Sequence, residues 1–340
     1  MKKIKVNVVS DSEFTVQGHG VHTAFTEMVN SLKSIPEIDL SVNSKDKDFD
    51  IIHIHTFGWY GAKNLWFQKN GKKVVSVHVI PDSLVADKLK LSKAWMPAMR
   101  QYMKTFYNKA DLNLAVSNKV AEVLERDFEI DKSKIHTMYN TINTSAFKTT
   151  AEDRAQARKK LKIPKSDLVV VGAGQLLPRK RIDSFISVAK KLPNINFFWV
   201  GGAPFKVVSS DFSKTKDLMK SAPPNVTFTG LVDRDLVTKY LQAADVFFLP
   251  AEQENHPVCV IEAAAVGLPI ILRNLEEYND TFRGDAILCK NNTEFSSAIK
   301  KLQSDPDFYK ETQKGSKKIA RRYDSKSGTK ELVKLYQELL

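Results

Sequence analysis

Two glutamates flank the start of a predicted helix in the segment LPAEQENHPVCVIEAAAVGLPII, residues 249–271. Glu254 precedes the helical run and Glu262 lies within it. The N–H groups in the first turn of a helix attract phosphate, and carboxylates beside them can accept hydrogen bonds from ribose or hexose hydroxyls. The segment therefore predicts a corner that can hold a nucleotide sugar.

Consecutive cations form a second candidate site. Arg179, Lys180 and Arg181 follow the strand-like run VVVGAG at residues 169–174 and precede another helical pattern. A diphosphate leaving group is stabilised by positive charge of this kind, although a solvated basic turn has the same composition.

The glutamate pair resembles the E-x7-E donor motif of glycosyltransferase family four, and Gly267-Leu268-Pro269 after it extends the match. The resemblance implies that Glu254 contacts the transferred sugar and that Glu262 holds the ribose. It also implies that the intervening loop faces the sugar and the pyrophosphate. That loop contains Asn255, His256, Pro257 and Val258.

The basic segment resembles a second element of the same family, G-R-x-x-x-x-K-G-x-D. Lys180 takes the phosphate position with Arg179 beside it, and the resemblance gives both a catalytic role. Gln175 replaces the usual arginine among the donor-binding residues, and Arg181 replaces the usual glycine. Either Arg179 or Arg181 supplies the missing charge, or the donor site is weakened.

Small residues follow the first strand-like run at Gly18-His19-Gly20, where backbone amides could approach an anionic group. The segment lacks the G-x-G-x-x-G spacing of a dinucleotide dehydrogenase. The family resemblance places Gly18 and Gly20 in the floor of a cleft between two domains, among the donor-binding residues.

Histidines end two further strand-like runs. The resemblance implies that His78 contacts the acceptor and the reacting sugar, while a buried core histidine is the alternative. His53 and His55 alternate within residues 51–55 and therefore share one face of a strand. We interpret these two as structural.

Apolar, β-branched runs alternate with helical patterns along the whole chain, which predicts an α/β architecture with buried parallel strands. With the family resemblance, this indicates the GT-B fold, two Rossmann-like doubly wound domains facing across a cleft. The expected strands are residues 4–9, 51–54, 74–79, 112–116, 168–171, 195–200, 226–228, 246–249 and 269–272. The expected helices include residues 21–32, 119–127, 182–191 and 236–243.

A polar, charged stretch at residues 148–165 carries no strand signal and marks the expected domain boundary. We predict an acceptor-facing and membrane-facing domain at residues 1–147 and a nucleotide-sugar-binding domain at residues 148–324. A helix at about 325–340 is expected to pack back on the first domain.

A basic amphipathic segment extends from residue 83 to residue 110. Trp95, Met99, Met103 and Phe106 recur at helical spacing, so this stripe could enter a bilayer headgroup region or pack on a core. Its expected membrane-facing residues are Lys88, Lys90, Lys93, Trp95 and Arg100.

Several shorter sequence motifs resemble those of the bacterial enzymes that add a second hexose to monoglucosyl-diacylglycerol. They include QGHGV at residues 17–21, HVIPDS at 78–83, FYNKAD at 106–111 and YNTIN at 139–143. The resemblance implies a retaining transfer from UDP-glucose or UDP-galactose to a glycolipid, giving an α-linked diglycosyl-diacylglycerol. Phe57, Trp59 and Tyr60 become candidates for stacking on the acceptor sugar, or they pack internally.

The 340-residue chain has a net charge of +13 and only two cysteines, in a spacing that suggests neither disulfides nor a zinc site. No apolar run is long enough to span a bilayer. We expect a cytoplasmic enzyme, peripheral on the inner face of the plasma membrane, with no cofactor or essential metal. A soluble transferase acting on a sugar or polysaccharide is the alternative, and a non-catalytic lipid- or nucleic-acid-binding protein is a third. The acidic pair and the lack of a nucleic-acid motif argue against nucleic acid.

Overall fold

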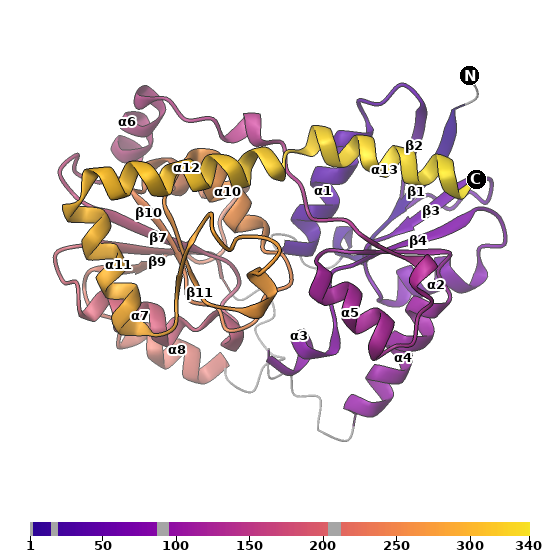
Figure 1. The fold of residues 1–340 in the computed structure, drawn as a ribbon, viewed down its shortest axis with the longest axis horizontal. Helices are drawn as coiled ribbons and strands as arrows, with labels where there is room; N and C mark the ends of the chain where they lie inside the picture. Colours follow the sequence, from indigo (N-terminus) through magenta and orange to yellow (C-terminus); the bar gives the residue numbers. More distant parts are fainter. Residues whose placement is uncertain (1–2, 15–19, 87–94, 203–211) are drawn as a thin grey trace. The chain divides into compact units, whose positions relative to one another are not determined.

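The computed structural model describes residues 3–14, 20–86, 95–202 and 212–340. Contacts divide the chain into two compact units (Figure 1). The first contains the described residues up to Val85, those from 95 to Asn143, and Tyr323–Leu340. The second contains the described residues of Thr144–Arg322.

A six-stranded parallel sheet forms the centre of the first unit, in the order β2-β1-β3-β4-β5-β6. Its strands are β1 (Ile4–Val9), β2 (Ile38–Val42), β3 (Ile51–Ile54), β4 (Lys72–Val77), β5 (Leu112–Ala115) and β6 (Ile135–Thr137). Its helices are α1 (Gly20–Leu32), α2 (Trp59–Phe67), α3 (Pro81–Ala86), α4 (Met96–Asn108), α5 (Asn118–Arg126) and α13 (Ser325–Leu339).

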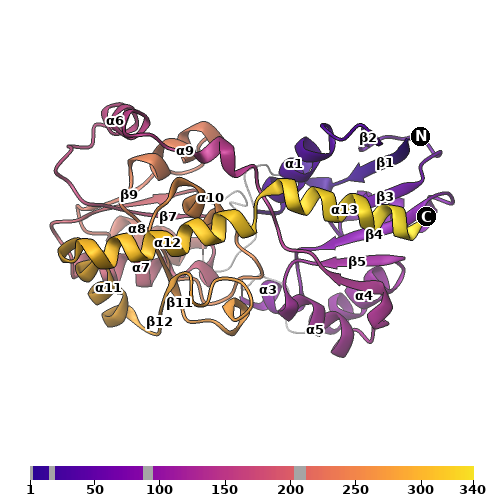
Figure 2. The same ribbon diagram turned by 45° about the horizontal axis from the view of Figure 1, so that its top comes forward.

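Alternate strand residues of this sheet enter two cores, one on each face. Val74 packs in the core that includes Phe25 of α1 and Leu332 of α13, and these two helices lie side by side in Figures 1 and 2. Val75 packs on the other face, in the core that includes Phe106 of α4 and the apolar side of α2 and α5. The chain's last helix thus completes the first unit.

The second unit also has six parallel strands, in the order β12-β11-β10-β7-β8-β9. Its strands are β7 (Val169–Ala173), β8 (Asn196–Val200), β9 (Val226–Phe228), β10 (Val246–Leu249), β11 (Ile270–Arg273) and β12 (Ile287–Cys289). Its helices are α6 (Ala151–Lys160), α7 (Ile182–Lys190), α8 (Phe212–Lys220), α9 (Arg234–Ala243), α10 (Val258–Val266), α11 (Asn292–Ser304) and α12 (Pro306–Arg322). The strand order reverses between β7 and β10, and ligands of such sheets bind at the carboxyl ends of the strands at that point.

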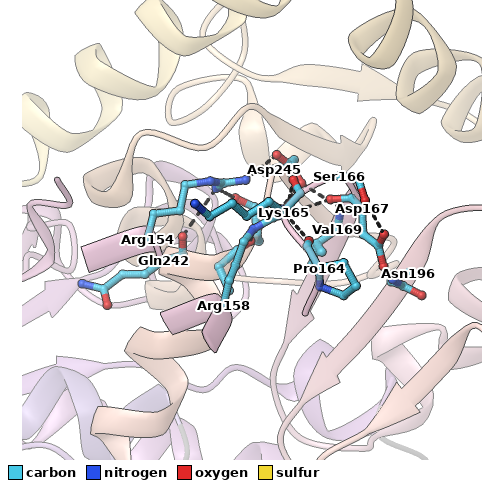
Figure 3. Close-up of polar contacts among 12 residues, drawn as sticks. Arg154, Arg158, Pro164, Lys165, Ser166, Asp167, Val169, Asn196, Gln242 and Asp245 are labelled. Atoms are coloured by element: carbon cyan, nitrogen blue, oxygen red, sulfur yellow. Dashed lines mark hydrogen bonds and ion pairs between the residues drawn. The ribbon is translucent and has the colours of Figure 1, made fainter. Parts of the chain in front are cut away.

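Helix α6 occupies most of the charged stretch at residues 148–165 and is fixed by an ionic cluster (Figure 3). Asp245, directly before β10, accepts from the guanidinium groups of Arg154 and Arg158 at 2.5 and 2.8 Å. Arg158 is buried and also donates to four backbone carbonyls, those of Ala243 and of residues 164, 165 and 167. The stretch is therefore a structured element of the second unit.

The predicted fold class, two Rossmann-like parallel domains, is confirmed. The sequence analysis did not predict β2, β6 or β12, and all three lie at sheet edges. Edge strands bury less of their surface, so they lack the continuous apolar run that identifies a central parallel strand.

Candidate active site

Two loops meet at the carboxyl ends of β7 and β10 in the second unit. The backbone amide of Glu252 donates to the carbonyl of Arg179 at 2.8 Å, and the Arg179 guanidinium donates to the carbonyl of Gln253 at 3.1 Å. These bonds join the two predicted motifs, although about seventy residues separate them in the sequence. The loops lie at the point where the strand order reverses, which is the binding position expected for this kind of sheet.

Glu254 is the centre of an ionic cluster between these loops. Its Oε1 lies 2.5 Å from Lys180 Nζ and 3.0 Å from an Arg179 guanidinium nitrogen. Glu254 and Lys180 are 5% and 6% exposed, so solvent screens their attraction little. Two cations face one carboxylate here, which leaves a net positive charge available to an anion.

Burial disfavours the charged form of the Glu254 carboxylate, but the charges of Lys180 and then Arg179 outweigh it and lower the pKa of Glu254 below its usual value. The carboxylate is therefore ionised at neutral pH. An ionised oxygen at this position can accept a hydrogen bond from a sugar hydroxyl.

Gly174, the residue after β7, makes room for the Lys180 side chain. Its φ of 141° lies in the region that favours glycine, and a Cβ there would come within 3.1 Å of Lys180 Cε. The strand end and the lysine position are thus coupled through one small residue.

Arg181 replaces the family's glycine and does not join the Glu254 cluster. Its guanidinium pairs with Asp183 at 2.7 Å and with Glu252 at 2.8 Å. Its backbone keeps the left-handed conformation, with φ 53° and ψ 55°, that a glycine would adopt without strain. Gln175 lacks the positive charge of the family's arginine, and Arg179 and Arg181 are the two candidates to supply it. In the part of the chain that the structure describes, Arg179 contacts Glu254 and Arg181 does not.

Glu262 lies in α10 and is 6% exposed. Its Oε1 is 3.1 Å from a guanidinium nitrogen of Arg234, the first residue of α9, and that guanidinium also stacks over the Phe147 ring. Arg234 is not among the site residues predicted from the sequence. Arg234 directly follows Asp233, whose side chain caps α9, and this position marks a helix start rather than a ligand site.

The loop before α10 presents its residues in different ways. Pro257 caps α10 and Val258 is its first residue, so the helix N-terminus lies where the sequence predicted it. The His256 ring is 4% exposed and stacks on Phe282, and burial lowers the pKa of His256 to about 3. The His256 ring is therefore neutral near pH 7, and Asn255 accepts a hydrogen bond from Gln253 at 2.9 Å, while the donor-binding roles of both residues stay predictions.

Several buried side-chain atoms near this cluster have no hydrogen-bond partner among the described residues. They include the Gln175 side-chain nitrogen and the Tyr278 hydroxyl. Tyr278 follows β11 and is 1% exposed, and burial first, then the charge of Glu254, raises the pKa of its hydroxyl. Buried polar groups without partners are rare in proteins, so both can serve a ligand. The sequence analysis did not single out Tyr278.

His78 follows β4 in the first unit and belongs to a row of stacked imidazoles. His78 Nε2 lies 3.1 Å from His55 Nδ1, and the His55 ring stacks on that of His53. His53 Nδ1 contacts the Tyr336 hydroxyl of α13 at 2.6 Å. Burial lowers the pKa of His53 to about 3 and that of His55 well below its usual value. His53 and His55 are core residues, as interpreted from the sequence, and His55 and His78 border a cavity of about 40 Å³.

The three acceptor candidates after β3 differ in exposure. Trp59 is 79% exposed, whereas Phe57 and Tyr60 pack partly against the core. The Tyr60 hydroxyl donates to the carbonyl of Asn43 at 2.9 Å. Phe57 and Tyr60 therefore have a partly structural role in the core, and the Trp59 ring is accessible to a ligand.

The apolar stripe of α4 is mainly a core element. Met103 and Phe106 are fully buried, so these two cannot enter a bilayer headgroup region. Trp95, before α4, is 64% exposed, and Arg100 is exposed 3.9 Å from Asp82. Gly18, Lys88, Lys90 and Lys93 lie outside the described residues. Gly20 begins α1, and a Cβ there would meet no atom within 4 Å.

No described helix is both long and apolar enough to cross a membrane. Among the described residues, no three His, Cys, Asp or Glu side chains are grouped to hold a metal ion.

The fold and the cluster define a nucleotide-sugar enzyme of the GT-B kind, and comparison with protein families agrees. Residues 153–319 match the family model "Glycosyl transferases group 1", and residues 11–146 match "Glycosyltransferase Family 4". An α-galactosylglucosyldiacylglycerol synthase of Streptococcus pneumoniae is 30% identical over 325 residues, 95% of this chain and 86% of that protein. This chain therefore belongs to the group 1 and family 4 glycosyltransferases, and the predicted enzyme class is confirmed.

Other similar proteins cover the whole chain. The processive diacylglycerol α-glucosyltransferase of Acholeplasma laidlawii is 27% identical over 99% of both chains. Among solved structures, Anabaena Alr3699/HepE in complex with UDP-glucose has a TM-score of 0.79 at 15% identity, covering 98% of this chain and 100% of that one. The sucrose-phosphate synthase of Thermosynechococcus elongatus has a TM-score of 0.78 at 16% identity, covering 99% of each chain. At these identities the structural likeness shows the fold alone.

Proposed function

We propose that this enzyme transfers a hexose from UDP-glucose or UDP-galactose to monoglucosyl-diacylglycerol, with retention, giving an α-linked diglycosyl-diacylglycerol. The buried cluster of Glu254, Lys180 and Arg179 carries the donor part of the proposal. The acceptor part is supported by the names of the two relatives, both of which act on diacylglycerol lipids and match nearly the whole chain.

The donor roles follow from charge and burial. Lys180 and Arg179 neutralise the diphosphate as the bond between its oxygen and the sugar C1 breaks. Glu254 accepts a hydrogen bond from a hydroxyl of the transferred sugar, and Glu262 accepts from the ribose hydroxyls. The unpartnered Gln175 nitrogen donates to a phosphate oxygen at the position where the family has an arginine.

The acceptor hydroxyl attacks C1 on the face from which UDP leaves, and its proton passes to the departing phosphate oxygen. His78 contacts the acceptor and the reacting sugar, and Trp59 stacks on the acceptor ring together with the exposed edges of Phe57 and Tyr60. We further propose that the enzyme works at the cytoplasmic face of the plasma membrane. Trp95 and Arg100, with Lys88, Lys90 and Lys93, contact the anionic surface.

A transfer assay with matched lysine variants tests this function. Purified enzyme is incubated with each UDP-hexose and monoglucosyl-diacylglycerol, and NMR assigns the anomeric configuration of the product. Lys180→Met should lower kcat/KM by roughly 10²–10³, as for loss of one preorganised donor. Lys190→Met, an exposed change on α7, should leave it unchanged. Transfer to soluble sugars alone, or full activity of Lys180→Met, would contradict the proposal.

A further inference from the structure

An apolar pocket opens in the first unit between α2, α4 and the loop before α2. Its volume is about 470 Å³, within the range of small-molecule sites. Six large apolar or aromatic side chains line most of it: Phe57, Trp59, Trp66, Phe67, Met99 and Tyr102. Ala62, a small residue of α2, also lines it, and Lys63 is its one charged lining residue.

The pocket is held open by packing that belongs to the folded core. The Tyr102 hydroxyl donates to the carbonyl of Phe57 at 2.5 Å, which ties α4 to the loop before α2. The Trp66 ring packs against the rings of Tyr102 and Phe106, with centroids 6.1 and 5.7 Å away. These contacts join the inner wall of the pocket to the folded core.

The rim exposes aromatic surface to solvent at both ends of α2. Trp59, its first residue, is 79% exposed, and Phe67, its last, is 74% exposed. Solvated proteins rarely leave large aromatic side chains so open beside an apolar pocket unless the surface meets another apolar phase. Trp in particular is favoured where hydrocarbon meets water.

The charge around the pocket is complementary to a lipid surface. Helices α2 and α4 contain Lys63, Arg100 and Lys104 and no acidic residue. Lys104 pairs with Glu129, and Arg100 lies 3.9 Å from Asp82, but Lys63 makes no ion pair among the described residues. The charge of Lys63 at the rim can attract an anionic membrane surface. The apolar pocket beside it can then take up a hydrocarbon chain from that membrane.

We propose that this pocket binds one acyl chain of the diacylglycerol acceptor. This inference rests on the proposed function, because the acceptor class comes from there. Each methylene that moves from water into the pocket should tighten binding roughly fourfold. The pocket would thus select lipid acceptors over water-soluble sugars of the same headgroup.

Fluorescence quenching tests occupancy without any catalysis. A variant that keeps Trp66 as its only tryptophan is mixed with micelles of a glycolipid whose acyl chains are brominated. We expect Trp66 emission to fall by at least half. A second variant keeps only Trp199, which is fully buried in the second unit, and its emission should not change. Unquenched Trp66 would overturn the proposal.

Kinetics test whether the pocket serves the reaction. Phe67→Ser removes an exposed ring and Ala62→Leu fills the pocket, and each should raise KM for a long-chain monoglucosyl-diacylglycerol at least fivefold. KM for chainless glucosyl-glycerol should stay the same. Leu340→Ser, at a similarly exposed site, is the control.

The outcomes separate the two proposals. The ratio of KM for the long-chain lipid to KM for glucosyl-glycerol could be the same in both pocket variants as in the wild type. That result would overturn the acyl-chain site and leave the proposed function intact. If the wild type transfers to no glycolipid, the proposed function fails, and Trp66 quenching alone decides for or against the pocket. The wild type could also form a dimer that Phe67→Ser dissociates, with no quenching of Trp66. That result would show that a second copy covers this face, and it would also overturn the proposal.

Discussion

Arg181 holds a backbone conformation that its side chain disfavours, and ion pairs offset that cost. Arg181→Ala keeps the left-handed backbone but loses the pairs with Asp183 and Glu252, whose side chains are 45% and 40% exposed. Arg181→Gly loses the same pairs and relieves the strain. We expect Arg181→Ala to lower the free energy of unfolding by about 1 kcal/mol and Arg181→Gly to be about 1 kcal/mol more stable than Arg181→Ala.

Urea unfolding of the three proteins measures both differences, and transfer assays should show no loss of activity in either variant, because Arg181 does not contact Glu254. Equal stability of the Ala and Gly variants would show that the backbone at residue 181 is unstrained.

Sequence motifs selected Glu254, Lys180 and Arg179, which the structure places in one ionic cluster, but they did not predict how these side chains pair. Glu254 and Lys180 come from motifs with distinctive spacing, so a resemblance could select them. Arg234 begins α9, which follows β9, and Tyr278 lies in a short turn after β11, so only the folded sheet brings them to the same edge. A single arginine after a helix cap, or one tyrosine in a short turn, has no spacing that marks a ligand site.

At the scale of elements, α6 is fixed to the sheet of the second unit by the buried Arg158. Arg158→Ala would leave Asp245 with fewer partners and would remove the donor to four carbonyls. We expect a loss of about 3–5 kcal/mol in the free energy of unfolding, as for breaking a buried ion pair. Lys159→Ala, an exposed change on the same helix, should have little effect.

Unfolding of Arg158→Ala can be followed through Trp199, the one tryptophan of residues 144–322. A midpoint equal to that of Lys159→Ala would show that the cluster in Figure 3 contributes no stability.

Central elements were predictable from the sequence, while edge elements and the orientation of α4 were not. Strands β7 and β10 are buried at every residue and appear as continuous apolar runs, and the central strands β1 and β3 are mostly apolar with one or two polar residues each. The period of α4 indicated a helix, but the same apolar stripe fits a core or a membrane. Burial of Met103 and Phe106 in the core decides that question, and this depends on neighbouring α2 and α5 rather than on α4 itself.

At the scale of the whole molecule, buried neutral histidines make stability depend on pH. His53 and His256 have pKa values lowered to about 3 by burial, and that of His55 is also lowered well below its usual value. The unfolded chain therefore binds more protons than the folded one below about pH 6.5, and stability falls as the pH drops from there toward 3. His53 and His256 each contribute about 2 kcal/mol of loss by pH 5, and His55 adds to the loss.

His53 and His55 lie in the first unit and His256 in the second, so the second unit should lose about 2 kcal/mol between pH 7 and pH 5 and the first unit should lose more. Urea unfolding at both pH values measures this, with Trp66 reporting on the first unit and Trp199 on the second. Equal stability at the two pH values would mean that these rings can be protonated within the fold.

The central claim is that Glu254 acts on the transferred sugar and Glu262 on the nucleotide. Glutamine variants of each keep the side-chain shape, and both kcat and the Kd of UDP are measured. Glu254→Gln should lower kcat roughly 10²–10³-fold, while UDP binding is preserved or tighter because Lys180 and Arg179 lose their carboxylate.

Glu262→Gln should weaken UDP binding about tenfold and leave kcat within threefold, since the ribose contact is the same in the ground and transition states. Unchanged constants in both variants, or the opposite division between kcat and Kd, would contradict the account.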